Sequence, residues 1–203
     1  MHDYQQTWNN RYGGGEYLFG KEPNEYFKSK IDSLQPASIL LPGEGEGRNA
    51  VYAAKLGWQV TALDFSKIAL KRAKQFAENE NVKIDFRYVH LLNDELPAKT
   101  YDVVGISFLH FNGDNKRLVH TKLRNALKTK GIVILECFSE EQMKLITGGP
   151  RNKGSLYTTD ELKEYYHGFE FFELEYKKVL LREGEAHQGE GYVVRMFAQK
   201  AEE

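Results

Sequence analysis

A glycine-rich turn followed by an acidic residue is the part of this sequence with the clearest chemical use. The turn, residues 42–47, reads Pro-Gly-Glu-Gly-Glu-Gly and follows a short apolar run, and Asp64 stands 21 residues after Gly43. Glycines let the backbone approach a ligand closely, and an acid at the tip of the next strand can accept both hydroxyls of a ribose. The pattern indicates a site for a cofactor that contains adenosine.

The charge of the turn separates two classes of adenosine cofactor. A dinucleotide needs a G-x-G-x-x-G turn against its pyrophosphate, but here Arg48 stands at the third glycine position. Glu44 and Glu46 would each repel a nearby phosphate charge by about 1 kcal/mol in water. S-adenosylmethionine carries a sulfonium and an ammonium group and no phosphate, so the acidic turn favours it over a nicotinamide dinucleotide.

Composition narrows the class of protein. The chain has 203 residues, of which 41% are hydrophobic, and 28 Lys and Arg against 29 Asp and Glu give a formal net charge of -1. Without a basic stripe or patch, we expect no nucleic-acid partner and no membrane partner. The single cysteine, Cys137, excludes an internal disulfide. Because no stretch approaches 18 apolar residues and the N-terminus has no apolar leader, we expect a cytoplasmic protein.

Strands and helices alternate along most of the chain. Apolar runs predict strands at residues 38–41, 58–63, 82–89, 101–108, 132–138, 169–181 and 191–199. Helical spacing predicts helices at residues 24–34, 48–56, 67–80, 115–128 and 159–167. This order is typical of an α/β fold with a doubly wound parallel sheet, and the last two strands, which have no helix between them, should pair antiparallel. The strand at 82–89 alternates apolar and polar residues, which favours an edge position.

The chain is predicted to form one domain, 1–203. Residues 1–23 are aromatic and glycine-rich without a sustained period, so we expect an irregular segment there. With the helix that follows, residues 1–35 should act as an N-terminal lid and helix. Residues 36–200 should form the Rossmann-like core.

Several stretches resemble a known family, the class I S-adenosylmethionine-dependent methyltransferases, and within it the tellurite-resistance branch. They read LLPGEGEGRNAVYAAKLGWQVTALDFS, YDVVGISFLHF, KGIVILECFSEEQ, GGP and LLREGEAHQGEGYVVR. The resemblance runs from about Trp8 to Lys200. It implies a seven-stranded Rossmann-like sheet, mostly parallel with the last strand antiparallel, with helices on both faces and S-adenosylmethionine as the cofactor.

The resemblance also implies which residues hold the cofactor. The glycine turn would hold its methionine and sugar portions, Asp64 its ribose, and Phe65 and Ser66 would border the adenine. The family usually places an acid for the adenine after the third strand, but here the chain reads HLLND at 90–94. The main chain at Leu91 and Leu92, or the Asn93 side chain, is the expected substitute. The full expected set is Arg11, Tyr17, Gly43, Glu44, Gly45, Gly47, Asn49, Asp64, Phe65, Ser66, Leu91, Leu92 and Ser107.

Two histidines are candidates for catalysis. His110 follows a strand at the sheet edge where ligands bind, and His187 stands in a polar loop between the last two strands, from where it could arch over that edge. His120 and His167 are predicted surface residues. A soft acceptor such as a thiol or a metalloid oxyanion arrives ionised and needs no base, whereas an oxygen or nitrogen acceptor would need one.

The sequence therefore predicts an S-adenosylmethionine-dependent methyltransferase that acts on a small-molecule acceptor, with a thiol or a metalloid oxyanion as the first classes to consider. No metal site is expected. Two alternatives stay open. A non-catalytic module that binds S-adenosylmethionine would carry the same turn and acid, and a nicotinamide-dependent reductase would require the acidic turn to tolerate a pyrophosphate.

Overall fold

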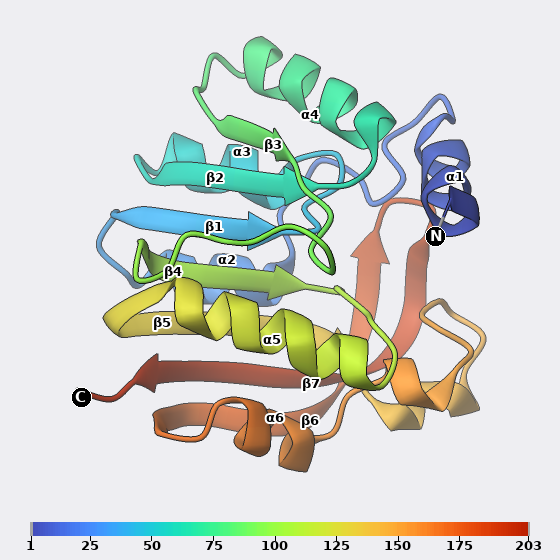
Figure 1. Ribbon diagram of the computed structural model, residues 1–203. Coiled ribbons are helices and arrows are strands. Elements are labelled where there is room, and N and C mark those ends of the chain that lie inside the picture. The colour runs from blue at the N-terminus through green and yellow to red at the C-terminus, as the bar shows by residue number, and fades with distance from the viewer. Residues whose placement is uncertain (1, 203) are drawn as a thin grey trace.

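A sheet of seven strands runs through the molecule in the order β3-β2-β1-β4-β5-β7-β6 (Figure 1). The computed structural model describes residues 2–202, and only the backbone of residues 2–4. All neighbouring strands are parallel except β7, which is antiparallel to both β5 and β6. The strands are β1 (Ser38–Pro42), β2 (Gln59–Asp64), β3 (Asp85–Tyr88), β4 (Tyr101–Ser107), β5 (Leu127–Phe138), β6 (Phe169–Glu183) and β7 (His187–Lys200).

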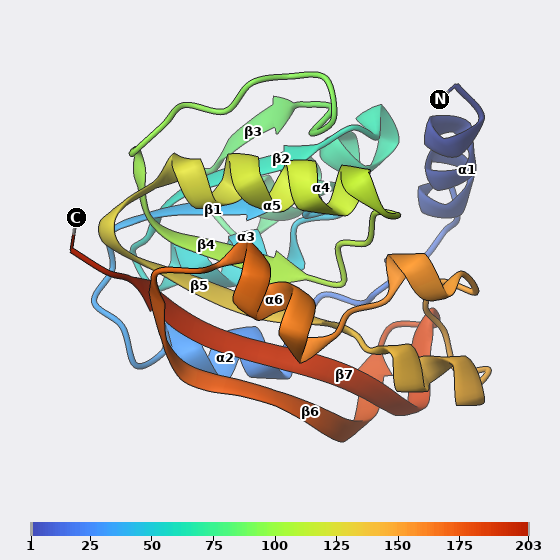
Figure 2. The ribbon, with the colours of Figure 1, turned by 60° about the horizontal axis from the view of Figure 1, so that its bottom comes forward.

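Helices cover both faces of this sheet (Figures 1 and 2). On one face, Phe27 of α2 and Ala50 of α3 pack in a core that includes Ile39 of β1. On the other face, Val119 of α5 packs in a core that includes Leu40. The helices are α1 (His2–Tyr12), α2 (Glu25–Ile31), α3 (Arg48–Lys55), α4 (Lys67–Asn79), α5 (Asp114–Ala126) and α6 (Thr159–Tyr165), with short 3-10 turns η1 (Glu140–Lys144) and η2 (Lys153–Ser155).

Alternation within β1 explains the two cores. Successive side chains of a strand point to opposite faces, and Ile39, Leu40 and Leu41 are all buried. A strand that is apolar on both faces belongs in the middle of a parallel sheet with helices on each side. The fold thus confirms the predicted α/β class, a doubly wound Rossmann-like sheet that is mostly parallel with the last strand antiparallel.

The carboxyl ends of the parallel strands share one edge, and three other segments gather there. The helix α1 stands at that edge, beside the turn that joins β6 and β7 (Figure 1). The backbone of Ala186 in that turn donates a hydrogen bond to the carbonyl of Leu18 at 3.2 Å. The segment 147–149 reaches the same place, because a side chain at Gly148 would meet the ring of His187 at 3.3 Å. The edge is therefore covered from three sides.

The structure corrects the prediction for the N-terminal segment. Residues 1–23 are not irregular throughout, since His2–Tyr12 form α1. The helix is held by contacts with distant residues: Gln5 donates to the carbonyl of Phe65 at 2.6 Å, and Asn9 accepts from the Ser66 hydroxyl at 2.7 Å. Such tertiary contacts override a weak local pattern. The predicted edge position of the third strand is confirmed, although β3 is shorter than residues 82–89.

In the part of the chain that the structure describes, none of the helices has the length and the apolar character that a membrane span requires.

Candidate functional site

Asp64 is the centre of the cofactor side of the site. It ends β2 with 5% exposure, and its two oxygens accept from the backbone N–H groups of Gly45 at 2.9 Å and Ser66 at 2.7 Å. These bonds clasp the glycine turn to the end of β2. A carboxylate has about four acceptor positions, and the backbone N–H of Phe65 also hydrogen-bonds to Asp64. The acceptor capacity that remains on this buried carboxylate fits a ribose hydroxyl.

Glu44 is the second carboxylate of this side. It accepts from the backbone N–H of Ala50 at 2.7 Å, in the first turn of α3, and from the Asn49 side chain at 3.5 Å. Burial raises the pKa of Glu44 to about 7 and the pKa of Asp64 to about 6. Both shifts mean that burial makes the ionised carboxylates less stable here than in water. A positively charged ligand beside them would stabilise the ionised forms, which fits the sulfonium and ammonium groups of S-adenosylmethionine.

Glu46, the other acid of the turn, has a different task. It forms an ion pair with Arg72 of α4 at 2.5 Å and accepts from the backbone N–H of Leu18 at 2.7 Å. It therefore ties residues 1–23, which we call the lead segment, to the core, and it is not available to a ligand in this arrangement.

The lead segment covers the glycine turn. Gly45 has a φ of +64°, and a side chain there would meet the hydroxyl of Tyr12 at 2.8 Å. Trp8 stacks on Tyr12 with ring centroids 5.4 Å apart, and the exposed Arg11 guanidinium lies 4.4 Å from the Trp8 ring. Tyr17 lies elsewhere, against α4, where its ring is 5.5 Å from that of Phe76. The cofactor roles of Arg11 and Tyr17 stay predictions.

The predicted adenine side lies under α1. Phe65 makes an edge contact with His90 at 5.7 Å, and the buried Nδ1 of His90 has no hydrogen-bond partner among the described residues. Leu91 is part of the core, and the carbonyl of Leu92 accepts from Lys122 at 3.4 Å. His90 therefore lies beside Phe65 on the predicted adenine side, and the sequence did not single it out.

The turn residues Gly43 and Gly47 are packed closely. A side chain at Gly43 would meet Leu109 at 2.6 Å, and one at Gly47 would meet Ala73 of α4 at 3.0 Å. The side chain of Asn49 points away from the turn's ligand face, since its oxygen accepts from the backbone N–H of Asn24 at 2.8 Å. Ser107 ends β4, and the residue after it, Phe108, has a φ of +50°, which is strained for a bulky side chain.

His187 lies in a box of aromatic rings, which we call the aromatic box and define as Phe19, Phe108, Phe138 and His187. Its ring centroid is 4.6 Å from Phe19, 4.5 Å from Phe108 and 5.1 Å from Phe138. His110 stacks on Phe138 at 5.8 Å. The structure therefore brings the two predicted histidines to the same phenyl ring. The three phenylalanines come from different segments, and no sequence pattern linked them.

Burial keeps both histidines neutral. It lowers the pKa of His110 to about 4 and lowers the pKa of His187, the latter against an opposing hydrogen bond from Glu183. Nδ1 of His110 lies 2.8 Å from the carbonyl of Ser155, and Nδ1 of His187 lies 2.9 Å from Glu183. Carbonyl and carboxylate oxygens only accept, so Nδ1 must be the protonated nitrogen in each ring. At pH 7 both rings are therefore free bases.

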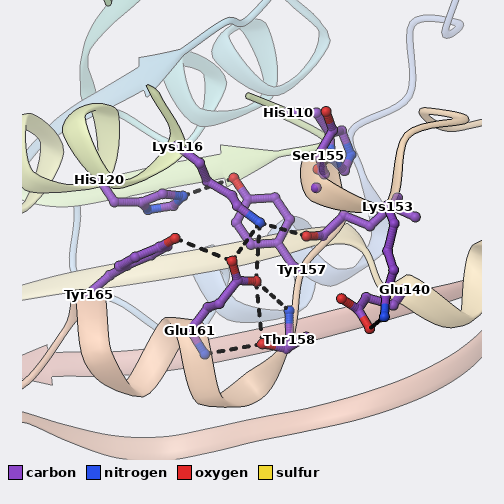
Figure 3. A network of polar contacts seen from close by, with 12 residues as sticks. His110, Lys116, His120, Glu140, Lys153, Ser155, Tyr157, Thr158, Glu161 and Tyr165 are labelled. Carbon is purple, nitrogen blue, oxygen red and sulfur yellow. Dashed lines mark hydrogen bonds and ion pairs between the residues drawn. The ribbon is translucent and has the colours of Figure 1, made fainter. Parts of the chain in front are cut away.

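His120 is not the surface residue that we predicted. It is 1% exposed, with Nδ1 2.9 Å from the Tyr166 hydroxyl and Nε2 2.9 Å from the Tyr157 hydroxyl. Figure 3 shows it facing the Tyr157 hydroxyl, on the other side of that ring from His110. The Tyr157 hydroxyl donates to the carbonyl of Leu109 at 2.9 Å, so this network anchors the residue next to His110. The buried face of α5, with Lys116, His120 and Leu123, explains the difference.

His120→Gln should make the protein less sensitive to acid. Burial lowers the pKa of His120 to about 3 in the folded state, while the unfolded chain takes up a proton below pH 6.5. The contribution of His120 to the free energy of unfolding is thus fully present above pH 6.5 and is lost as the pH falls, by about 2 kcal/mol at pH 5. Denaturant titrations at pH 7 and pH 5 should show the variant losing less stability than the parent chain. His167→Gln, at an exposed position, is the control, and equal losses in both variants would contradict the assignment.

Known methyltransferases match the part of the chain that holds the glycine turn and Asp64. A family model described as a methyltransferase domain matches residues 39–131, from β1 into β5. The probable S-adenosyl-L-methionine-dependent methyltransferase TehB of Haemophilus influenzae is 26% identical over 159 residues, which are 76% of this chain and 52% of the relative. Residues 39–131 thus match a methyltransferase domain, and the chain is similar to the class I S-adenosylmethionine-dependent methyltransferases. It spans about half the length of this curated relative.

Solved structures agree with this methyltransferase fold. The crystal structure of TehB from Haemophilus influenzae has a TM-score of 0.72 at 20% identity, covering 88% of this chain and 62% of that chain. A structure described under the conversion of a disulfide bond into a thioacetal group during echinomycin biosynthesis has a TM-score of 0.78 at 18% identity, with 98% and 92% covered. These likenesses show the fold.

Relatives of this chain carry names with different methyl acceptors, ribosomal protein L11 in one and a tRNA nucleoside in another. The tRNA 5-carboxymethoxyuridine methyltransferase of Escherichia coli is 30% identical over 76 residues, which are 37% of this chain and 29% of the relative. The family model matches residues 39–131, which include the glycine turn and Asp64, so the acceptor has to be argued from the aromatic box.

Cofactor binding should release protons near pH 6. Because burial raises the pKa values of Glu44 and Asp64, a share of both groups is protonated in the free protein at that pH. A cationic ligand that donates hydrogen bonds favours their ionised forms, so the Kd should fall as the pH rises from 5 to 8, by up to tenfold per pH unit for each group. Calorimetry at pH 6 in buffers of different ionisation enthalpy measures the protons, and Glu44→Gln should reduce their number. A constant Kd across this range would contradict the role of both acids.

Proposed function

We propose that the chain is a cytoplasmic enzyme that transfers a methyl group from S-adenosylmethionine to a small-molecule acceptor, with thiols and metalloid oxyanions as the first classes to test. The observation that carries the proposal is the meeting of two sides at one sheet edge. The buried Asp64 and the half-buried Glu44 supply two carboxylates, and the aromatic box lies beside the same strand ends. A box closed by three covering segments suits a small acceptor better than a folded RNA or protein.

The residues of the cofactor side would bind and orient. Asp64 would accept from a ribose hydroxyl, and Glu44 would face the positive groups, with the glycine turn between them. S-adenosylmethionine, when bound, supplies a methyl group on a positively charged sulfur that a nucleophile can attack in line. The aromatic rings would exclude water and hold the acceptor, and such positioning alone supplies roughly 7 to 11 kcal/mol of barrier lowering in favourable cases.

The lead segment is proposed to be a lid over both halves. It places Tyr12 over Gly45 and Phe19 against His187, so one segment covers the turn and the aromatic box. S-adenosylhomocysteine should therefore slow proteolysis near Gly13–Gly15, which are exposed, at least several-fold. Limited proteolysis with and without the ligand measures this, with cleavage near the exposed Ile146 as an internal comparison. Equal rates at Gly13–Gly15 would contradict the lid.

The experiment that tests the proposed function is a methyl-donor consumption assay over a panel of acceptors. The panel contains thiols, metalloid oxyanions, phenols and amines, together with tRNA and ribosomal protein. Turnover with one of the small molecules supports the proposal. Turnover confined to tRNA or protein would retain the methyltransferase activity and overturn the small-molecule acceptor.

A further inference from the structure

Glu183 is a buried carboxylate, 8% exposed, that the sequence did not single out. One oxygen lies 2.9 Å from Nδ1 of His187 and 3.0 Å from the Arg48 guanidinium, and the other accepts from the Asn24 side chain at 2.9 Å. Guanidinium and side-chain amide N–H groups only donate, so both partners favour the ionised carboxylate. Glu183 is thereby held in one orientation, facing the imidazole.

This arrangement leaves the other nitrogen of the ring without a proton. A carboxylate accepts from Nδ1–H, which makes Nε2 of His187 a bare lone pair. His110 repeats the pattern, because the Ser155 carbonyl accepts from its Nδ1–H, and its buried Nε2 has no hydrogen-bond partner among residues 5–202. Buried polar atoms are almost always satisfied, so an unpaired acceptor beside Phe138 calls for a donor from a ligand.

The residues around the His187 ring indicate whether that ligand is charged or neutral. Phe19, Phe108 and Phe138 offer apolar faces within about 5 Å of the His187 ring centroid. The nearest buried cation, Arg48, is neutralised by Glu183, and Arg11 lies on the exposed side of Trp8. No unpaired buried cation among these residues would hold an oxyanion. Apolar walls with bare nitrogen acceptors suit a neutral, flat molecule that carries one hydrogen-bond donor.

We propose that Glu183 is a positioning residue that fixes His187 with Nε2 bare, and that the aromatic box binds a neutral acceptor through an O–H or S–H group. The inference rests on the proposed function in calling this ligand the acceptor. In the reaction, the O–H or S–H bond breaks, its proton forms a bond with Nε2 of His187, and its electron pair stays on oxygen or sulfur. The Glu183 carboxylate then balances the charge of the imidazolium.

The first test reads the histidine nitrogens directly. In ¹⁵N spectra of the full chain between pH 6 and 8, His187 and His110 should carry their protons on Nδ1. Glu183→Gln keeps the shape of the side chain and removes its charge, so His187 should become a mixture of tautomers and its pKa should fall further. The charged and titratable groups that act on this ring are Glu183, Arg48, Arg11 and His110.

Glu175→Gln is the matched control, since Glu175 lies on the same strand and pairs with Lys177 near the surface. It should leave the His187 signals unchanged. If Glu183→Gln does not fold, Glu183→Asp keeps a charge for Arg48 while withdrawing the carboxylate from the ring, and it should shift the His187 tautomer in the same direction. A proton on Nε2 of His187 in the parent chain would overturn the inference.

The second test uses phenol and toluene, which share a shape and differ in the O–H group. Titrations followed by the His187 and phenylalanine signals should show phenol binding about fivefold or more tightly than toluene, as one hydrogen bond provides. His187→Phe should bring the two affinities together. Equal affinities in the parent chain, or tighter binding of selenite than of phenol, would overturn the inference.

Both tests are independent of S-adenosylmethionine. Methyl transfer by a chain whose His187 carries its proton on Nε2 would sustain the proposed function and reject the role of Glu183. If His187 has the expected tautomer and the protein binds phenol, but no acceptor is methylated, the role of Glu183 is supported and the proposed function is rejected.

Discussion

Asp64→Ala should weaken the binding of S-adenosylmethionine and S-adenosylhomocysteine about a hundredfold. The variant loses a hydrogen bond from a ribose hydroxyl to a charged acceptor, worth up to about 3 kcal/mol, which gives this factor. It also loses the clasp on Gly45 and Ser66, so the glycine turn is no longer held against β2. Calorimetry with both ligands measures the effect.

Two further variants make the Asp64 result specific. Asp64→Asn keeps an acceptor for one backbone N–H and should fold with the parent chain's melting temperature to within a few degrees, yet bind at least tenfold more weakly. Asp85→Ala removes a half-exposed carboxylate that pairs with Arg87 on β3 and should leave both affinities unchanged. If Asp64→Ala folds and binds normally, Asp64 has no part in holding the ribose.

His187→Ala should lower turnover of a proton-bearing acceptor by about 10² to 10⁴ while leaving S-adenosylhomocysteine affinity unchanged. The neutral ring is oriented by Glu183 and lies in the aromatic box, so its loss removes the proton acceptor without touching the glycine turn. His110→Ala should reduce turnover at least tenfold, since its ring borders the same Phe138. Initial rates and calorimetry on the same preparations separate the two effects.

The exposed His167→Ala is the control for both histidines. An acceptor that arrives already ionised should be much less affected by either substitution, because no proton has to be removed. Parent-level turnover of a phenol or thiol in both variants would place the acceptor outside the aromatic box.

The sheet and the cofactor side could be predicted because their signals are local. The apolar run of β1, the glycines after it and the acid at the end of β2 lie within 30 residues, and strand ends in a parallel sheet meet at one edge. The alternation of strand and helix patterns along the sequence was sufficient to predict the doubly wound arrangement of the sheet. Even so, Glu46 holds the lead segment and does not face a ligand. The acidic character of the turn alone could not separate these two roles.

The acceptor side could not be predicted because its members meet only after folding. Phe19, Phe108 and Phe138 come from the lead segment, a strand end and β5, and none of them belongs to a motif. Glu183 and His187 face each other across the β6–β7 turn, a pairing that depends on the register. The burial of His120 could have been predicted from the sequence. Positions 116, 119, 120 and 123 lie on one face of a helix, and this spacing is typical of a face that packs against the core.

The bond between Ala186 and Leu18 joins two segments that lie far apart in the sequence, and this has a consequence for biosynthesis. A ribosome delivers Leu18 long before Ala186, so the lead segment has no hairpin turn to bond until β6 and the turn after it have been made. A contact across 168 positions closes a long loop, and loops of this kind form late in folding. We therefore expect nascent chains that stop before β6 to lack the finished candidate site, so that the proposed methyl transfer would begin only after synthesis of the hairpin.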